Sequence, residues 1–304
     1  MTEPAPEPAT DLRQQAEAPG LRQRAEALAG NLPSLLADAE HLASTVLLGE
    51  HGRRRSGRGD EFWQYRPAMP GDAARTIDWR RSARSDQHFI REKEWQAAQS
   101  VLLWVDDARS MGFSGGAERP EKGARARLLA LAVAVLLIRG GERVGLTGLM
   151  APPRSGQVQL IRLAEALGTQ GEADYGTPEA RGMLPHSRAL FVSDFLGDLA
   201  PVEVAMTEAA DRGVRGAVLQ VLDPHEEAFP FDGRTLFESM TGAIRYETLK
   251  AGDLRSRYLD RLAARKARLA ALARATGWLY SCHHTGDPAQ GALLWLYRSL
   301  ERVH

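Results

Sequence analysis

The sequence predicts an α/β protein with a doubly wound, mostly parallel sheet. Short, unbroken apolar runs such as Val101–Val105 are typical of strands that are buried on both faces. Helical patterns alternate with these runs from residue 100 to the end of the chain, which is the order that builds a parallel sheet. With 304 residues, 43% of them hydrophobic, the chain can form a sizeable core in one large or two modest domains.

The first part of the chain differs from the rest. Residues 1–20 are rich in Pro, Ala and Glu and lack the basic start and apolar core of a signal peptide, so we expect a disordered lead-in. Residues 21–48 suit one or two helices, because apolar residues recur at helical spacing and Pro33 stands near the start of the second. We therefore divide the chain into the lead-in (1–20), a helical and basic–aromatic extension (21–95) and an α/β domain (96–304).

The segment 51–93 carries eleven basic and six acidic residues, a net charge of +5, interleaved with aromatic residues. Such a segment could bind nucleic acid through phosphate contacts and base stacking. The alternative is a folded segment whose arginines pair with the carboxylates and stack on the rings. The mixed charges and the Pro70-Gly71 turn favour the folded segment. The whole chain has 39 basic and 39 acidic residues, so its net charge indicates no class of partner.

From residue 100 the elements follow in regular order. The strand 101–105 precedes a helix over 124–139, which stops at Gly140-Gly141 and has so wide an apolar face that it must be buried against the sheet. A strand over 143–150, a helix over 158–167 and a polar loop over 168–176 come next.

Thr177-Pro178-Glu179 then predicts a helix start, with Thr as the N-cap and Pro at the first helical position. The same periodicities predict the remaining elements: strands over 189–192 and 216–222, a helix over 200–212, an extra or edge strand over 244–249, a helix over 253–275, a strand over 278–282 and a helix over 289–302.

Composition also indicates the compartment. Cys282 is the single cysteine, so an intramolecular disulfide is excluded and a reducing cytoplasm is expected. The most apolar stretch, Leu128–Ile138, is shorter than the roughly 20 residues that cross a bilayer, so we expect no direct membrane insertion. His283-His284 beside the cysteine could suggest a soft metal, but no second cluster with ligand spacing accompanies them.

Acidic residues follow three of the predicted strands: Asp106, Asp194 and Asp223. In a parallel sheet these strand ends share one edge, so Asp106 and Asp194 could meet at a switch point in strand order, with Ser110 and Thr177 nearby. Oxygen ligands of this kind suit Mg²⁺ or Mn²⁺ better than Zn²⁺. The alternative is that the carboxylates after the first strand only cap the following turn and face water.

This constellation resembles the von Willebrand factor A domain, whose metal-ion-dependent adhesion site has the pattern Asp-x-Ser-x-Ser on its first loop. Aligned on Asp106, the chain reads Asp106-Asp107-Ala108-Arg109-Ser110. Ala108 supplies no ligand where the pattern has its first Ser. The resemblance therefore implies a degenerate site in which Mg²⁺ or Mn²⁺ binding is weak or absent, with these residues as the remaining candidates: Asp106, Ser110, Thr177 and Asp194.

An upstream motif resembles a narrower family, and it consists of Glu61, Arg66, Gly71, Asp72, Arg75, Asp78, Trp79, Ser82 and Arg84. That family is the MoxR-associated, von Willebrand factor A-like bacterial family of unknown function (DUF fifty-eight), and the resemblance runs from about residue 45 to the end. The motif charges suit an Arg–carboxylate network that pins the segment onto the A-like domain, and the alternative is a direct partner surface.

The resemblance implies a function without catalysis. Members look like adaptors or co-chaperones for a MoxR-type AAA+ ATPase in protein assembly or maturation, with other A-domain-like proteins as further possible partners. The chain has no Walker loop, so ATP use would belong to the partner. A nucleic-acid-binding protein using residues 51–93 is the alternative function, although the mixed charges of that segment and its Pro70-Gly71 turn argue against nucleic acid as a partner.

Overall fold

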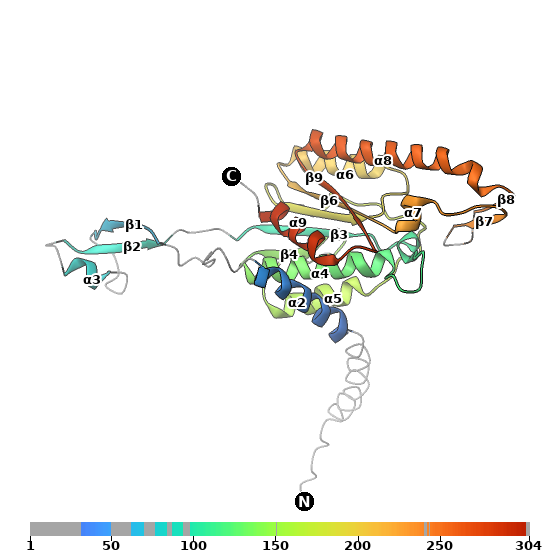
Figure 1. Ribbon diagram of the computed structural model, residues 1–304. Coiled ribbons are helices and arrows are strands. Elements are labelled where there is room, and N and C mark those ends of the chain that lie inside the picture. The colour runs from blue at the N-terminus through green and yellow to red at the C-terminus, as the bar shows by residue number, and fades with distance from the viewer. Residues whose placement is uncertain are drawn as a thin grey trace, which may run out of the picture.

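The computed structural model describes residues 32–49, 62–69, 77–83, 87–93, 98–149, 151–239, 242 and 244–301. The lead-in expected over 1–20 lies outside these residues. At the centre is a five-stranded sheet in which every pairing is parallel, in the order β4-β3-β5-β6-β9 (Figure 1). Its strands are β3 (Ser100–Val105), β4 (Arg143–Leu146), β5 (Arg188–Ser193), β6 (Arg215–Leu222) and β9 (Leu279–His284). The predicted α/β class with a mostly parallel sheet is confirmed.

Strand order reverses beside β3. The chain runs from β3 to β4 on one side and then returns to place β5 on the other side. Leu103 on β3 is paired with Leu146 on β4 and with Leu190 on β5. The carboxyl ends of β3 and β5 therefore lie next to each other at the switch point, where open α/β sheets place their ligands.

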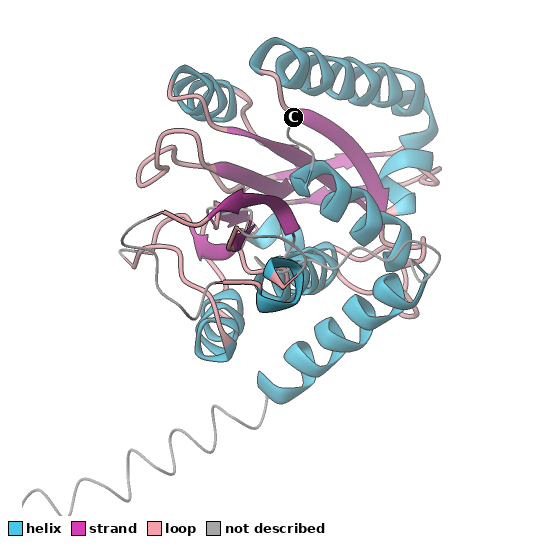
Figure 2. Ribbon diagram, turned by 90° about the vertical axis from the view of Figure 1, so that its left-hand side faces the viewer, coloured by secondary structure: helices cyan, strands magenta, loops and turns pink. Residues whose placement is uncertain are grey.

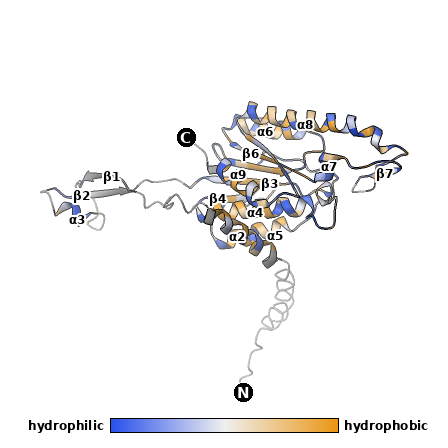
Figure 3. Ribbon diagram, in the orientation of Figure 1, coloured by the Kyte–Doolittle hydropathy of each residue, from blue (hydrophilic) through white to orange (hydrophobic). Residues whose placement is uncertain are grey.

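Helices cover both faces of the sheet (Figure 2). One face carries α4 (Lys122–Arg139) and α9 (Ala289–Glu301), and the other carries α6 (Ala200–Asp211) and α8 (Arg255–Thr276). Figure 3 shows that much of α4 is hydrophobic, and its buried residues belong to this layered core. Because successive strand residues point to opposite faces, Leu190 packs under α4 while Phe191 packs towards α6 and α8.

Helix α2 (Leu32–Gly49) belongs to the same core. It packs on α4, on α5 (Gln157–Leu167) and on α9, and Ala39 and Ala43 are fully buried there. Residues 21–95 were expected to form one extension, but α2 packs as part of the α/β domain, which covers its apolar face. Among the described residues, no helix is both long and apolar enough to cross a membrane.

A small unit precedes the sheet. β1 (Phe62–Pro67) and β2 (Phe89–Lys93) pair antiparallel, and the short helix α3 (Trp79–Ser82) lies between them in sequence. In Figure 1 this unit stands apart from the α/β domain.

The prediction of a helix starting at Thr177 is wrong. Residues 177–187 are irregular, because Gly182 and His186 take left-handed φ values of 85° and 60° while Ala180 and Met183 anchor the segment in the core. The segment is held by packing, so its N-cap signal is overridden.

Other boundaries differ by a few residues. The strand expected over 143–150 ends at Leu146, and the one expected over 278–282 continues to His284. The extra strand expected over 244–249 is β8 (Arg245–Thr248), which pairs with β7 (Thr235–Glu238) in a separate hairpin. A short helix that the sequence analysis did not predict, α7 (Pro224–Ala228), follows β6 directly.

Candidate functional site

Asp106 follows β3 at the switch point and is 2% exposed. Its Oδ1 accepts a hydrogen bond from the backbone N–H of Ala108 at 2.9 Å, and its Oδ2 accepts one from the hydroxyl of Ser193 at 2.6 Å. Burial raises the pKa of Asp106, and the nearby carboxylate of Asp194 acts in the same direction. Asp106 and Asp194 lie at one edge of the sheet, as predicted. The alternative, in which the carboxylate of Asp106 faces water, is wrong, because Asp106 is buried.

The carboxylate of Asp194, after β5, is paired with a lysine that the sequence analysis missed. The Nζ of Lys122 lies 2.8 Å from Asp194 Oδ2 and 2.6 Å from Glu226 Oε1, and its side chain is 1% exposed. The same ammonium lies 5.6 Å from the centre of the Phe113 ring. Burial acts to lower the pKa of Lys122, but the two carboxylates outweigh burial and raise the pKa, so the lysine is charged.

Lys122 reaches this edge because α4 begins there. A basic residue at the first position of a helix faces the positive end of the helix dipole, where acidic residues are favoured. That unfavourable position was the one signal in the sequence that could have pointed to a paired lysine.

The third acidic strand end, Asp223, is linked to the same network through a helix cap. It is the N-cap of α7: its Oδ1 accepts from the N–H of His225 at 2.8 Å, while its own N–H donates to Glu226 Oε2 at 2.9 Å. Arg119 Nε lies 3.2 Å from Asp223 Oδ2. Burial acts to raise the pKa of Asp223, but hydrogen bonds from the N–H groups of His225 and Gly115 and from Thr285, together with the charge of Arg119, lower it. The capping box thus fixes Glu226 for its contact with the lysine.

The two remaining metal candidates lie in different surroundings. Ser110 is 8% exposed, and among the described residues its hydroxyl has no hydrogen-bond partner. Thr177 is exposed. Its neighbour Gly176 closes over Asp106, since a Cβ at that glycine would lie 2.2 Å from Asp106 Oδ1. The loop therefore reaches the switch point through Gly176.

This arrangement does not fit a divalent ion. Asp194 Oδ2 already binds an ammonium, and a second cation beside that ammonium would be repelled in a buried, weakly screened place. Ala108 contributes only its backbone N–H, which is a donor and cannot bind a metal. The carboxylates that the sequence analysis assigned to Mg²⁺ or Mn²⁺ are thus held by a lysine, a serine hydroxyl and backbone N–H groups.

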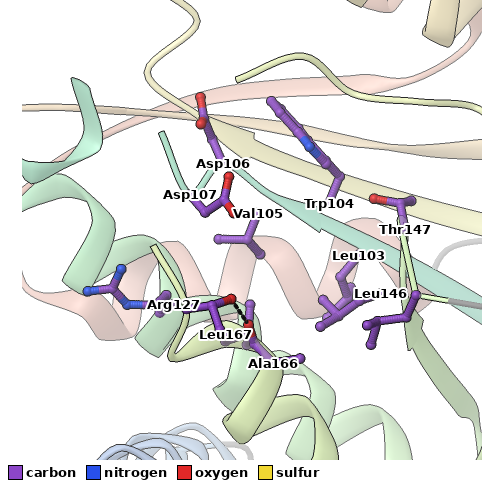
Figure 4. A pocket seen from close by; sticks show the side chains of 12 residues that line it. Leu103, Trp104, Val105, Asp106, Asp107, Arg127, Leu146, Thr147, Ala166 and Leu167 are labelled. Carbon is purple, nitrogen blue, oxygen red and sulfur yellow. Dashed lines mark hydrogen bonds between the residues drawn. The ribbon is translucent and has the colours of Figure 1, made fainter. Parts of the chain in front are cut away.

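A cavity of about 190 Å³ opens beside this network, between the ends of β3 and β4 and the helices α4 and α5. Figure 4 shows Asp107 and Arg127 on one side of it and Leu103 and Leu146 on another. Asp107 is exposed, and the backbone N–H of Gly171 donates to its carbonyl oxygen at 2.9 Å. The cavity therefore combines an apolar wall with two acidic residues, Asp106 and Asp107, and one arginine, Arg127.

A second group of metal-type donors lies at the edge strand β9. Glu227, Cys282 and His284 place their donor atoms within 4.8 Å of one another. The ammonium of Lys266 is paired with Glu227. His284 Nε2 lies 3.0 Å from the same carboxylate. Here again a lysine supplies the positive charge beside the acidic donor.

The upstream motif is described only in part. Glu61, Gly71, Asp72, Arg75 and Arg84 lie outside the described residues, as do the surroundings of the Arg66 side chain.

Asp78 is the N-cap of α3, where its Oδ1 accepts from the N–H groups of Arg80 and Arg81, each at 3.1 Å. Ser82 is buried, and its Oγ accepts from the N–H of Phe89 on β2 at 2.9 Å. These motif residues organise their own small unit, and Trp79 is 57% exposed.

Comparisons with solved structures give weak likenesses. An aerotolerance-related membrane protein from Bacteroides fragilis is 17% identical with a TM-score of 0.41, covering 67% of this chain and 98% of that one. The conserved hypothetical protein BatB from Bacteroides thetaiotaomicron is 16% identical with a TM-score of 0.40, at the same coverages.

Comparisons of sequence match a larger share of the chain than those of structure. Uncharacterized proteins of Mycobacterium bovis and Mycobacterium tuberculosis are 27% identical over 271 residues, which is 82% of this chain and 82% of each relative. The family model described as "Protein of unknown function DUF58" matches residues 64–268. The chain therefore belongs to the DUF58 family of proteins of unknown function.

Proposed function

We propose that this protein is a non-enzymatic interaction module with a von Willebrand factor A-like fold, working in the cytoplasm as an adaptor or co-chaperone for a MoxR-type AAA+ ATPase. The strand order, with its switch point beside β3, is compatible with that fold. The family membership and the upstream motif support the link to such an ATPase only by resemblance.

The cavity beside Asp107 is the observation on which this proposal depends. Its volume of about 190 Å³ is below the roughly 300–1,000 Å³ of typical small-molecule sites. A space of that size suits one side chain of a protein partner. The apolar wall at Leu149, which is 46% exposed, would take an aliphatic or aromatic side chain, while Asp107 and Arg127 would orient polar groups around it.

The test uses the full-length protein as bait in lysate with Mg²⁺ and ATP, and mass spectrometry identifies the retained proteins. We expect a MoxR-type ATPase to be retained by the unaltered protein and lost with Asp107→Arg or Arg127→Glu. Glu208→Arg, an exposed change on α6, is the matched control and should retain the ATPase. Retention that is unaffected by the two cavity variants would refute this surface.

A second candidate function is supported by the small N-terminal unit. Trp79 is exposed, and Arg80 and Arg81 beside it in α3 are exposed as well. An exposed ring can stack on a base, and exposed arginines that follow it in the same helix can contact phosphates. Fluorescence anisotropy with single-stranded DNA and RNA, repeated at several salt concentrations, tests this function. A titration without saturable, salt-dependent binding would exclude it.

A further inference from the structure

We propose that the ammonium group of Lys122 is the permanent cation of the switch-point site, in the place that Mg²⁺ or Mn²⁺ would otherwise take. The proposal is independent of the identity of any partner. It rests on the position of one buried lysine between the carboxylates of Asp194 and Glu226, with the carboxylate of Asp106 near that of Asp194.

Burial is the first argument. A lysine side chain is almost never fully buried unless it is paired, and that of Lys122 is 1% exposed. Its Nζ makes two short, charge-assisted contacts, at 2.8 Å to Asp194 Oδ2 and at 2.6 Å to Glu226 Oε1. The lysine is therefore built into the core of this edge, unlike a surface lysine that happens to lie near acids.

Charge balance is the second argument. Asp106, Asp194 and Glu226 bring three carboxylates into one poorly solvated region, which would be unstable without a positive charge. A metal ion could supply that charge, and so can an ammonium. The two cannot share the place, since both need Asp194 Oδ2 and would repel each other.

The loop after β3 provides the third argument. A divalent ion would gain from a hydroxyl at position 108, but Ala108 offers only its N–H, which stabilises the carboxylate of Asp106 directly. Ala108 therefore supplies no metal ligand at the edge where Lys122 already supplies a positive charge. In consequence Asp194 and Glu226 have a positively charged partner without any divalent ion.

Isothermal titration of Mn²⁺ and of Mg²⁺ into the full-length protein tests the proposal. The unaltered protein should give no saturable binding at millimolar ion, and EDTA should leave its Tm unchanged. Lys122→Ala should gain saturable Mn²⁺ binding, with a Kd at least about tenfold below the millimolar range in which the unaltered protein shows none. Adding Asp194→Asn should remove that gain, and Lys250→Ala, at an exposed lysine, should bind no Mn²⁺.

Two results of these titrations would overturn the proposal. Micromolar Mn²⁺ binding by the unaltered protein, abolished by Asp194→Ala, would overturn the proposal. A folded Lys122→Ala protein that takes up no Mn²⁺ would overturn it as well, because the lysine would then not occupy a cation site. If Lys122→Ala does not fold alone, Lys122→Gln replaces it, and a rise in Tm on adding Mn²⁺ is the supporting result.

Discussion

Replacing Lys122 with Met should lower the free energy of unfolding at pH 7 by about 3–5 kcal/mol. Met has a similar length and no charge, so the substitution removes the ammonium while leaving little empty space. Asp194 and Glu226 then lose contacts of 2.8 and 2.6 Å in a place that solvent hardly screens, since the lysine is 1% exposed. Domains are stable by about 5–15 kcal/mol, so this loss is a large fraction of the total.

Urea unfolding followed by tryptophan fluorescence measures this loss, with Lys250→Met as the control at an exposed lysine. The control should stay within about 0.5 kcal/mol of the unaltered protein. Burial raises the pKa of Glu226 in the folded state, and removal of the ammonium acts in the same direction, so the deficit of the Lys122→Met protein should shrink as the pH falls and this carboxyl becomes protonated. A deficit below about 1 kcal/mol, or one that grows in acid, would refute the assignment of a buried ion pair.

Three further changes test other parts of the structure. Burial lowers the pKa of His283 to about 4, so the folded state binds a proton at His283 more weakly than the unfolded state does. The free energy of unfolding should therefore fall by up to about 3 kcal/mol between pH 6.5 and 4. Urea titrations at several pH values measure this fall, and His283→Gln should remove it. Gly176→Ala would place a Cβ 2.2 Å from Asp106 Oδ1, so it should lower the free energy of unfolding by about 1–3 kcal/mol. Gly291→Ala is the control, because this glycine lies in α9 with open space around it, and it should raise the free energy of unfolding by about 0.5–1 kcal/mol in the same assay. Asp78→Ala should destabilise the small unit by about 0.5–2 kcal/mol, and faster amide hydrogen exchange in β1 and β2 would show this loss. Asp78→Asn keeps a capping side chain and should exchange more slowly than Asp78→Ala. Equal exchange in both variants would contradict the capping role.

The sequence by itself determined the α/β class and the position of most elements. Unbroken apolar runs specify buried strands, and the near-continuous apolar face of α4 requires burial, whatever the rest of the chain does. It also determined that Asp106 and Asp194 would share one edge, because the carboxyl ends of parallel strands meet there. These conclusions need only local periodicity and the geometry of a parallel sheet.

Only the tertiary structure decided what those carboxylates bind. Lys122 lies 72 residues from Asp194 and 104 residues from Glu226, and no local pattern joins positions so far apart. Similarly, the signal for a helix at Thr177 was overridden because Gly176 has to pass close to Asp106 while the following residues anchor in the core. Charges and loops at a buried edge are set by whichever groups the fold brings together, since burial makes every unpaired charge costly.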